Sequence, residues 1–258
     1  MAKFQCNLVS YTLQRTVDVT VIIPTPTIPD RLNNDPRRHT PKEKYPVLYL
    51  LHGMGGNHSS WPGYSNVEMY AEERQIAVVT FSGENKSYVK VGNDDFFTFV
   101  SEELPDFVCG MFPVSDKPEH TYIAGLSMGG YGTYVHALNF PERFCAFGAF
   151  SAATRLNSAN TGGPDAVVPD EYCPDKLAEK IAAAGKKFPK AYIACGAKDS
   201  LFENNKELRD KLKKLGADVT WVEHPDYGHE WRFWNWQIEE FLKWIPRTDA
   251  YRKELRAV

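Results

Sequence analysis

The sequence predicts an α/β fold with a mostly parallel central sheet, helices on both of its faces and an antiparallel N-terminal hairpin. Of its 258 residues, 43% are hydrophobic and 24% are charged, which are globular proportions and sufficient for one large core. Short apolar runs alternate with amphipathic segments, the pattern of strands buried between covering helices. No repeat, low-complexity tract or linker divides the chain, so we expect a single domain over residues 1–258.

The first residues predict the antiparallel hairpin. Between residues 17 and 23, apolar side chains alternate with the polar Asp18 and Thr20, which is the period of two expected of a half-buried strand. Residues 7–11 supply its partner strand. Several prolines between residues 24 and 44 then indicate a surface loop.

Apolar runs predict the parallel strands, and amphipathic segments predict the helices that cover them. The runs are residues 47–51, 76–81, 122–126, 144–150, 191–195 and 219–222. The helical segments are residues 66–75, 94–111, 128–139, 175–185, 202–215 and 230–244. Ligands bind to such folds beyond the carboxyl ends of the strands, so we expect the functional residues in the loops at that edge.

Two segments depart from this simple alternation. Pro105 lies inside the predicted helix 94–111 and should kink or break it, because proline has no N–H and its ring clashes with the preceding turn. Residues 151–174 show no clear period and contain glycines and prolines. An excursion of that length after a strand is more often a lid or a pocket wall than a plain turn, and we expect one of these here.

The segment from Gly125 to Gly129 carries the pattern G-x-S-x-G between a predicted strand and a predicted helix. A nucleophile elbow has this pattern because its serine sits on a sharp turn, where side chains two residues to either side would collide. The alternative is a glycine-rich helix start that Ser127 merely caps. The strand before and the helix after favour the elbow, so Ser127 is the predicted nucleophile.

A serine hydroxyl needs a base, and in this class of fold the catalytic order is serine, acid, histidine. His136 lies inside the predicted helix after the elbow, where packing is its expected role. His224 and His229 flank the loop after the last predicted strand. We predict His229 as the base, because Gly228 permits a sharp turn and because His229 lies further from the strand end. His224 is then a structural residue of the loop.

The acid that orients the base should follow the preceding strand. Asp199 lies just beyond the apolar run 191–195 and is the predicted acid. Its alternative role is to cap the helix that follows, since aspartate is a common N-cap. Asp226 is the competing carboxylate, but it precedes His229 within one loop.

An oxyanion hole needs two backbone N–H groups. The residue after the nucleophile supplies one, and the first strand-to-helix loop of the parallel sheet supplies the other. These criteria select the amides of Met128 and of Met54, which follows the pair His52-Gly53. Both methionine side chains are then free to line the acyl pocket, or they simply pack.

The sequence does not support other chemistries. The net charge of −3 and the absence of a basic cluster argue against nucleic-acid binding, and the run 47–51 is far too short to span a membrane. The glycine-rich loop 53–56 lacks the third glycine of a dinucleotide fingerprint, because position 58 is His58. Phe233 stands where a zinc-protease motif starting at His229 needs its second histidine. We therefore expect no cofactor and no metal.

Cysteine usage indicates the compartment. The five cysteines are an odd number, are scattered and form no C-x-x-C, which predicts free thiols in a reducing environment. The first residues lack the apolar core of a signal peptide. We expect a cytoplasmic protein that binds a small-molecule ester, with no membrane partner. No sequence pattern indicates its oligomeric state.

Four blocks of sequence carry a family resemblance. They are LHGMGGNH at residues 51–58, AGLSMGG at 124–130, CGAKDSL at 195–201 and GHEW at 228–231. In this order they resemble the esterase D / tributyrin esterase family of α/β-hydrolases, and the similarity extends over most of the chain. The resemblance implies an α/β-hydrolase fold and a serine carboxylesterase with Ser127, Asp199 and His229 as its triad. It likewise implies that the Met54 and Met128 amides form the oxyanion hole.

The family includes acetylesterases, feruloyl esterases and S-formylglutathione hydrolases. We expect hydrolysis of short-chain acyl esters through an acyl-enzyme on Ser127, because the segment 151–174 is short and offers little wall to enclose a phenylpropenoyl acid. Trp231 follows His229 closely enough to reach the site. The alternatives are a feruloyl esterase or an S-formylglutathione hydrolase with the same triad, an acyltransferase, and a binding protein without activity.

Overall fold

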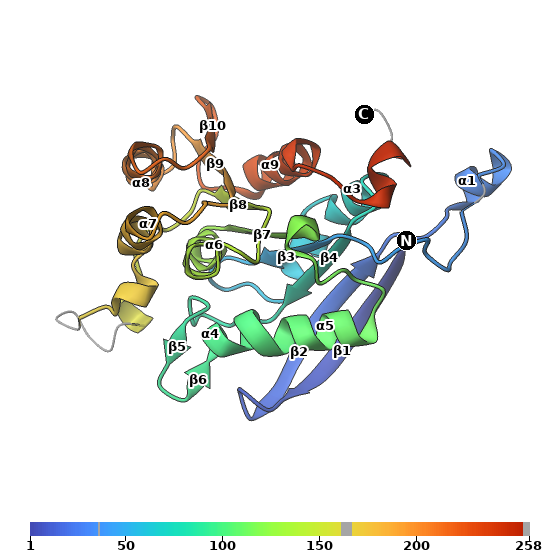
Figure 1. The fold of residues 1–258 in the computed structure, drawn as a ribbon, viewed down its shortest axis with the longest axis horizontal. Helices are drawn as coiled ribbons and strands as arrows, with labels where there is room; N and C mark the ends of the chain where they lie inside the picture. Colours follow the sequence, from blue (N-terminus) through green and yellow to red (C-terminus); the bar gives the residue numbers. More distant parts are fainter. Residues whose placement is uncertain (36, 161–166, 255–258) are drawn as a thin grey trace.

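The computed structural model describes residues 1–35, 37–160 and 167–254. Its main sheet has eight strands in the order β1-β2-β4-β3-β7-β8-β9-β10 (Figure 1). The strands of this sheet are β1 (Ala2–Ser10), β2 (Arg15–Ile23), β3 (Val47–Leu51), β4 (Ala77–Phe81), β7 (Thr121–Leu126), β8 (Ala146–Phe150), β9 (Lys190–Gly196) and β10 (Val219–His224). A separate short pair is formed by β5 (Lys90–Val91) and β6 (Asp94–Asp95).

The pairing of the strands confirms the predicted sheet. β1 pairs with β2, and β2 with β4, in antiparallel fashion, whereas every pair from β4 through to β10 is parallel. All of the predicted parallel strands are present, with ends that differ by at most two residues. β1 begins at Ala2 instead of residue 7, so the hairpin is longer than predicted.

Helices cover both faces of the sheet (Figure 1). They are α1 (Ile28–Leu32), α2 (Ser60–Tyr64), α3 (Val67–Glu73), α4 (Phe96–Thr98), α5 (Leu104–Met111), α6 (Met128–Asn139), α7 (Pro174–Ala183), α8 (Phe202–Lys214) and α9 (Trp231–Trp244). The short α1 was not predicted, and it interrupts the proline-rich loop. Thr27 starts it with a capping box, in which its side chain accepts from the Asp30 amide and the Asp30 carboxylate accepts in return.

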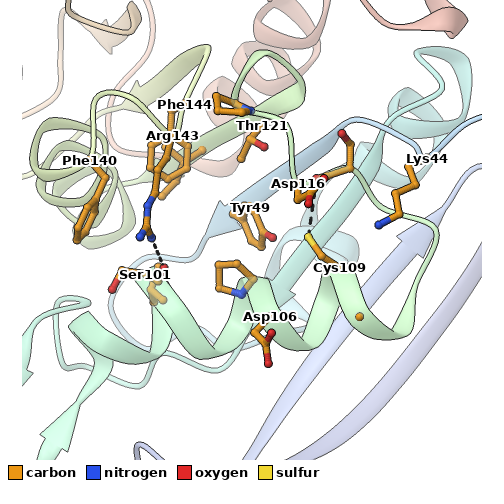
Figure 2. Close-up of a pocket in the computed structure, with 16 residues that line it drawn as sticks. Lys44, Tyr49, Ser101, Asp106, Cys109, Asp116, Thr121, Phe140, Arg143 and Phe144 are labelled. Carbon is orange, nitrogen blue, oxygen red and sulfur yellow. Dashed lines mark hydrogen bonds between the residues drawn. The ribbon is translucent and has the colours of Figure 1, made fainter. Parts of the chain in front are cut away.

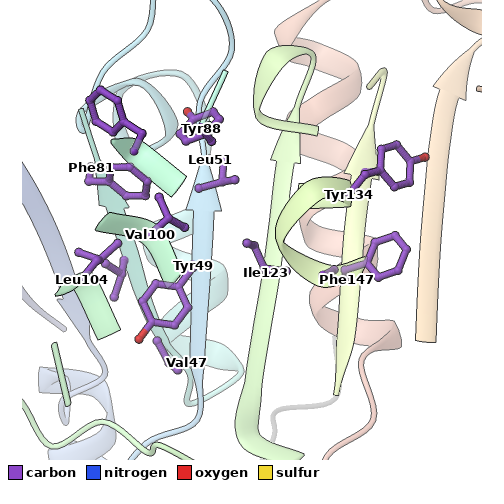
Figure 3. Close-up of a cluster of buried hydrophobic side chains, with 14 of the residues drawn as sticks. Val47, Tyr49, Leu51, Phe81, Tyr88, Val100, Leu104, Ile123, Tyr134 and Phe147 are labelled. Atoms are coloured by element: carbon purple, nitrogen blue, oxygen red, sulfur yellow. The ribbon is translucent and has the colours of Figure 1, made fainter. Parts of the chain in front are cut away.

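The core consists of two main clusters, one on each face. β3 shows how the sequence builds them: Val47, Tyr49 and Leu51 belong to one cluster, and the alternate residues Leu48 and Leu50 belong to the other. Figure 3 shows side chains of the first cluster, which come from β3, β4, β7, β8, α5 and α6. Both faces are therefore apolar, which is why these strands read as continuous hydrophobic runs.

The predicted start of helix 94–111 is wrong, and its regular α-helical pattern is interrupted before Pro105, although the chain stays helical from Phe96 to Met111. Residues 94 and 95 are strand β6, α4 follows, and residues Phe99–Glu103 form a π-helical turn that leads into α5. Pro105 has no N–H to donate to the carbonyl of Ser101, four residues earlier. The Arg143 guanidinium donates to that carbonyl instead (Figure 2).

A cavity of about 470 Å³ lies beside this π-helical turn, near the amino ends of β3 and β7 (Figure 2). Its lining includes Tyr49, Ser101, Cys109 and Arg143. At the opposite edge, the predicted lid or wall at 151–174 contains two single turns, Ser158–Asn160 and Asp170–Tyr172. Residues 161–166 of that prediction lie outside the described residues.

Candidate active site

Ser127 lies on a tight turn between β7 and α6. Its backbone has φ 53° and ψ −116°, a conformation that costs energy for a residue with a side chain. A Cβ added to Gly125 would come within 2.4 Å of the Gly129 carbonyl oxygen, and one added to Gly129 within 2.4 Å of the Leu51 carbonyl oxygen. The glycines of the G-x-S-x-G pattern are thus required by close backbone contacts.

The structure brings Ser127, His229 and Asp199 together in one chain of hydrogen bonds. The Oγ of Ser127 lies 3.0 Å from Nε2 of His229, and Nδ1 of His229 lies 2.8 Å from Oδ2 of Asp199. The three residues follow β7, β10 and β9, whose carboxyl ends share one edge of the sheet. Because Ser127 makes no capping hydrogen bond through its side chain, the alternative of a simple helix cap is wrong.

Asp199 is held as an anion. Its side chain is fully buried, and burial alone would raise the pKa of its carboxyl group. The hydrogen bonds from the His229 ring and from the Leu201 amide, the latter 2.9 Å long, outweigh burial and leave the pKa below its usual value. Asp199 does not cap the following helix as its alternative role predicted, because the N-cap residue of α8 is Leu201 and the bond from the Leu201 amide precedes the helix.

The other histidines downstream of Ser127 have structural surroundings. His224 ends β10, where its ring packs against Tyr227 and Trp236 and its Nδ1 accepts from the Asp226 amide at 3.2 Å. His136 is buried in α6, and its Nε2 lies 2.9 Å from the Tyr88 carbonyl oxygen. In the part of the chain that the structure describes, the Ser127 hydroxyl forms its hydrogen bond with His229, and neither of these two histidines forms one with it.

The amides predicted for the oxyanion hole flank the nucleophile. A Cβ built on Gly53, the residue before Met54, would lie 3.5 Å from the Cβ of Ser127. Within the described residues, neither the Met54 nor the Met128 N–H has a protein acceptor, so both remain available to a ligand. The Met54 side chain is 56% exposed, whereas that of Met128 is 4% exposed and packs in the core.

The aromatic neighbour of His229 is Trp234, which the sequence reasoning did not single out. Its ring meets that of His229 at 4.9 Å, edge to face. Trp231 instead stacks on the exposed Tyr64 at 5.0 Å and touches Trp234. The spacing of three residues between Trp231 and Trp234 places both on one side of α9, which was the signal available in the sequence.

Other kinds of site find no support in the described ranges. No group of three or more His, Cys, Asp or Glu side chains there could hold a metal ion. No helix in the same ranges is long and apolar enough to cross a bilayer.

Comparison with known proteins places this geometry in context. The Esterase family model matches residues 31–245. An acetyl esterase of Caldicellulosiruptor saccharolyticus is 30% identical over 96% of this chain and 99% of its own length.

Solved structures agree with this similarity. A fluorophosphonate-binding serine hydrolase of Staphylococcus aureus, solved with substrate bound, is 28% identical with a TM-score of 0.83 over 94% of this chain and 97% of its own. An S-formylglutathione hydrolase of the same organism is 27% identical with a TM-score of 0.82, over 94% of this chain and 98% of its own.

Proposed function

We propose that this chain, which belongs to the Esterase family and is a serine-dependent hydrolase of carboxylic esters, forms its acyl-enzyme on Ser127. The observation that carries the proposal is the unbroken chain of hydrogen bonds from Ser127 through His229 to Asp199. A hydroxyl becomes a competent nucleophile when a positioned base can take its proton.

In the first half-reaction, Ser127 Oγ attacks the ester carbonyl carbon and its proton passes to Nε2 of His229. The carbonyl oxygen becomes an anion that accepts from the Met54 and Met128 amides. The intermediate collapses, the C–O bond to the alcohol breaks, and His229 returns the proton to the leaving oxygen. Asp199 holds the His229 tautomer and stabilises the imidazolium. In the second half-reaction water replaces the alcohol, and the acid and the free enzyme are released.

Release of p-nitrophenol from p-nitrophenyl acetate in a single turnover tests this assignment. Ser127→Ala should abolish the acyl-enzyme and lower the rate by several powers of ten. A variant that kept the parent rate would exclude Ser127 as the nucleophile. The absence of any release by the parent protein would instead favour the alternative of a binding protein with an idle triad.

We further propose that the preferred acyl groups are short. The relative from C. saccharolyticus is named an acetyl esterase. The segment after β8 supports this reading, since Ala153 donates its N–H to the Ser127 carbonyl at 3.0 Å and Ala152 is fully buried. The two residues of this segment that follow Ser151, Ala152 and Ala153, thus place only methyl side chains beside the nucleophile.

The acyl preference is tested by kcat/KM for p-nitrophenyl acetate, butyrate and octanoate beside methyl ferulate and S-formylglutathione. We expect the maximum at acetate or butyrate, with graded losses, because one methylene in an apolar pocket is worth about 1–3 kcal/mol. A maximum at octanoate, or methyl ferulate above acetate, would contradict the short-acyl reading. A kcat/KM for S-formylglutathione above that of every ester would assign thioester hydrolysis to this protein. If an added alcohol or sugar became the main acceptor of the acyl group, the protein would be an acyltransferase.

We also propose a single folding unit over residues 1–258 in a cytoplasmic, reducing setting. The support is the shared core of the sheet and the five free cysteines. One cooperative unfolding transition, and five titratable thiols in protein isolated without reductant, are the expected results.

A further inference from the structure

We infer that His52 is a positioning residue, which holds the Met54 amide in the oxyanion hole by clamping the Gly53–Met54 peptide group. This inference rests on the proposed function, in which the Met54 N–H stabilises the oxyanion. His52 itself lies outside the hole and is 1% exposed.

The hydrogen bonds of His52 fix its tautomer. The Gly83 N–H lies 2.9 Å from Nε2 of His52, and a backbone N–H can only donate, so Nε2 is unprotonated and accepts. The ring proton of the neutral imidazole is then on Nδ1, which lies 2.7 Å from the Gly53 carbonyl oxygen. His52 therefore donates to Gly53 and accepts from Gly83 at the same time.

The bond to Gly53 sets the direction of the Met54 N–H. The Gly53 C=O and the Met54 N–H belong to one peptide group, and the described residues contain no cis peptide bond. In a trans peptide these two groups point in opposite directions. A carbonyl held toward His52 therefore turns the Met54 N–H away from the imidazole, and Gly53 itself lies against Ser127.

Few other contacts hold this peptide group. The Met54 side chain is 56% exposed, and its N–H has no acceptor among the described residues. Met54 lies between Gly53 and Gly55, and glycine residues change their backbone conformation readily. Besides His52, the Gly56 N–H bonds the Gly53 carbonyl at 3.1 Å. Loss of the His52 donor would leave the Gly53 carbonyl with the longer bond from Gly56 alone, and this weaker hold would let the Met54 N–H turn away from the hole.

His52 is in turn fixed by its surroundings. The Tyr88 hydroxyl donates to the His52 carbonyl at 2.8 Å, and the Tyr88 ring meets the imidazole edge to face at 5.7 Å. Burial, with a smaller contribution from the charge of His58, lowers the pKa of His52 to about 4. The ring therefore stays neutral and keeps its tautomer at the pH where esters are hydrolysed.

Two substitutions separate positioning from simple packing. His52→Asn places an amide N–H near the position of Nδ1 and keeps the donor to Gly53. His52→Gln places an amide oxygen near Nε2, keeps the acceptor for Gly83 and loses that donor. Removing one oxyanion donor costs about 10²–10³ in kcat, so we expect a loss of that size for H52Q, less than tenfold for H52N, and little change in KM for either.

His136→Asn is the matched control, since it also replaces a buried imidazole bonded to a backbone carbonyl and should lower the melting temperature while kcat stays near the parent value. If H52N and H52Q lost the same share of kcat, and this loss came with a similar fall in their melting temperatures, the inference would be overturned. Failure of the proposed function looks different, because Ser127→Ala would then stay active.

A measurement on the unsubstituted enzyme covers the case in which H52Q does not fold. Imidazole ¹⁵N shifts should assign the Nδ1–H tautomer to His52, and the Met54 amide proton should move downfield when a boronic acid forms its tetrahedral adduct on Ser127. An Nε2–H tautomer, or an unmoved Met54 amide beside a shifted Met128 amide, would contradict the clamp.

Discussion

The polar groups at the two edges of the central sheet differ in what they bond. At the amino ends of the strands, the polar groups around the 470 Å³ cavity serve the scaffold (Figure 2). Arg143 donates to the Ser101 carbonyl, and the Cys109 thiol to the Ser115 carbonyl at 3.8 Å. At the carboxyl ends, Ser127 is bonded to a base and the Met54 amide is left without a protein acceptor. We therefore attribute reactivity to the alignment of Ser127 with its base and to the unpaired Met54 amide, and not to the presence of a cavity.

The largest expected effect separates the two histidines that flank the final loop. His229→Ala should lower kcat by about 10⁵–10⁶, because base and nucleophile act as one unit. His224→Ala removes a ring that packs on Tyr227 and Trp236 and should leave kcat within a few-fold. Steady-state rates on p-nitrophenyl acetate compare them. The reverse outcome would move the base to His224.

Replacement of the acid gives the next largest effect. Asp199→Asn is isosteric, but its amide cannot hold the His229 tautomer that accepts from Ser127, so kcat should fall by about 10⁴. Asp226→Asn changes an exposed carboxylate that lies 3.6 Å from Lys198 and serves as the matched control, with unchanged kcat. Retained activity in D199N would show that another carboxylate orients the base.

Acid should weaken the fold before it protonates the paired carboxylates. Burial, the largest cause in each, lowers the pKa of His52 and of His136 to about 4 from 6.5. Between pH 6.5 and pH 4 these two histidines are therefore protonated in the unfolded chain and neutral in the folded protein. Their contribution to the free energy of unfolding is complete above pH 6.5 and is lost as the pH falls toward 4. Each imidazole accounts for about 3 kcal/mol at full extent.

Urea unfolding between pH 7 and pH 4.5 measures this dependence. His136→Gln keeps a side-chain N–H for the Tyr88 carbonyl but has no titratable group, so its slope should be about half that of the parent. An unchanged slope in that variant would mean that His136 does not titrate in this window.

The smallest expected effect lies at the amino-end cavity. Arg143→Met removes the donor to the Ser101 carbonyl and should cost about 1 kcal/mol of stability, because water can reach this exposed site. The value of kcat/KM should match the parent. A change of tenfold or more in kcat/KM with an unchanged melting temperature would show that the amino-end cavity contributes to catalysis. The two edges of the sheet would then not differ in function as described.

The sequence identifies the parts that depend on local patterns. Ser127, Asp199 and His229 follow from a turn motif and from their order after strands, and β3 has its predicted ends because both of its faces are buried. β1 is an edge strand with mixed exposure, so its first residues carry no clear period.

Features that depend on distant partners had no sequence signal. In the π-helical turn before Pro105, the Ser101 carbonyl accepts a hydrogen bond from Arg143, which lies 42 residues further along the chain. The tautomer of His52 is fixed by the Gly83 amide, 31 residues away. The sequence pattern around His52 indicates only a glycine-rich loop. The contact of Trp234 with His229 differs from these, because the spacing of Trp231 and Trp234 indicated their shared side of α9 and left open only which of the two faces His229.

Covalent labelling tests the central claim most directly. Incubation with a fluorophosphonate should add one phosphonyl group, and peptide mass spectrometry should locate it on Ser127. The same reagent should react far more slowly with His229→Ala and not at all with Ser127→Ala. A label on any other residue, or equal labelling of the His229→Ala variant, would contradict the account that His229 activates Ser127.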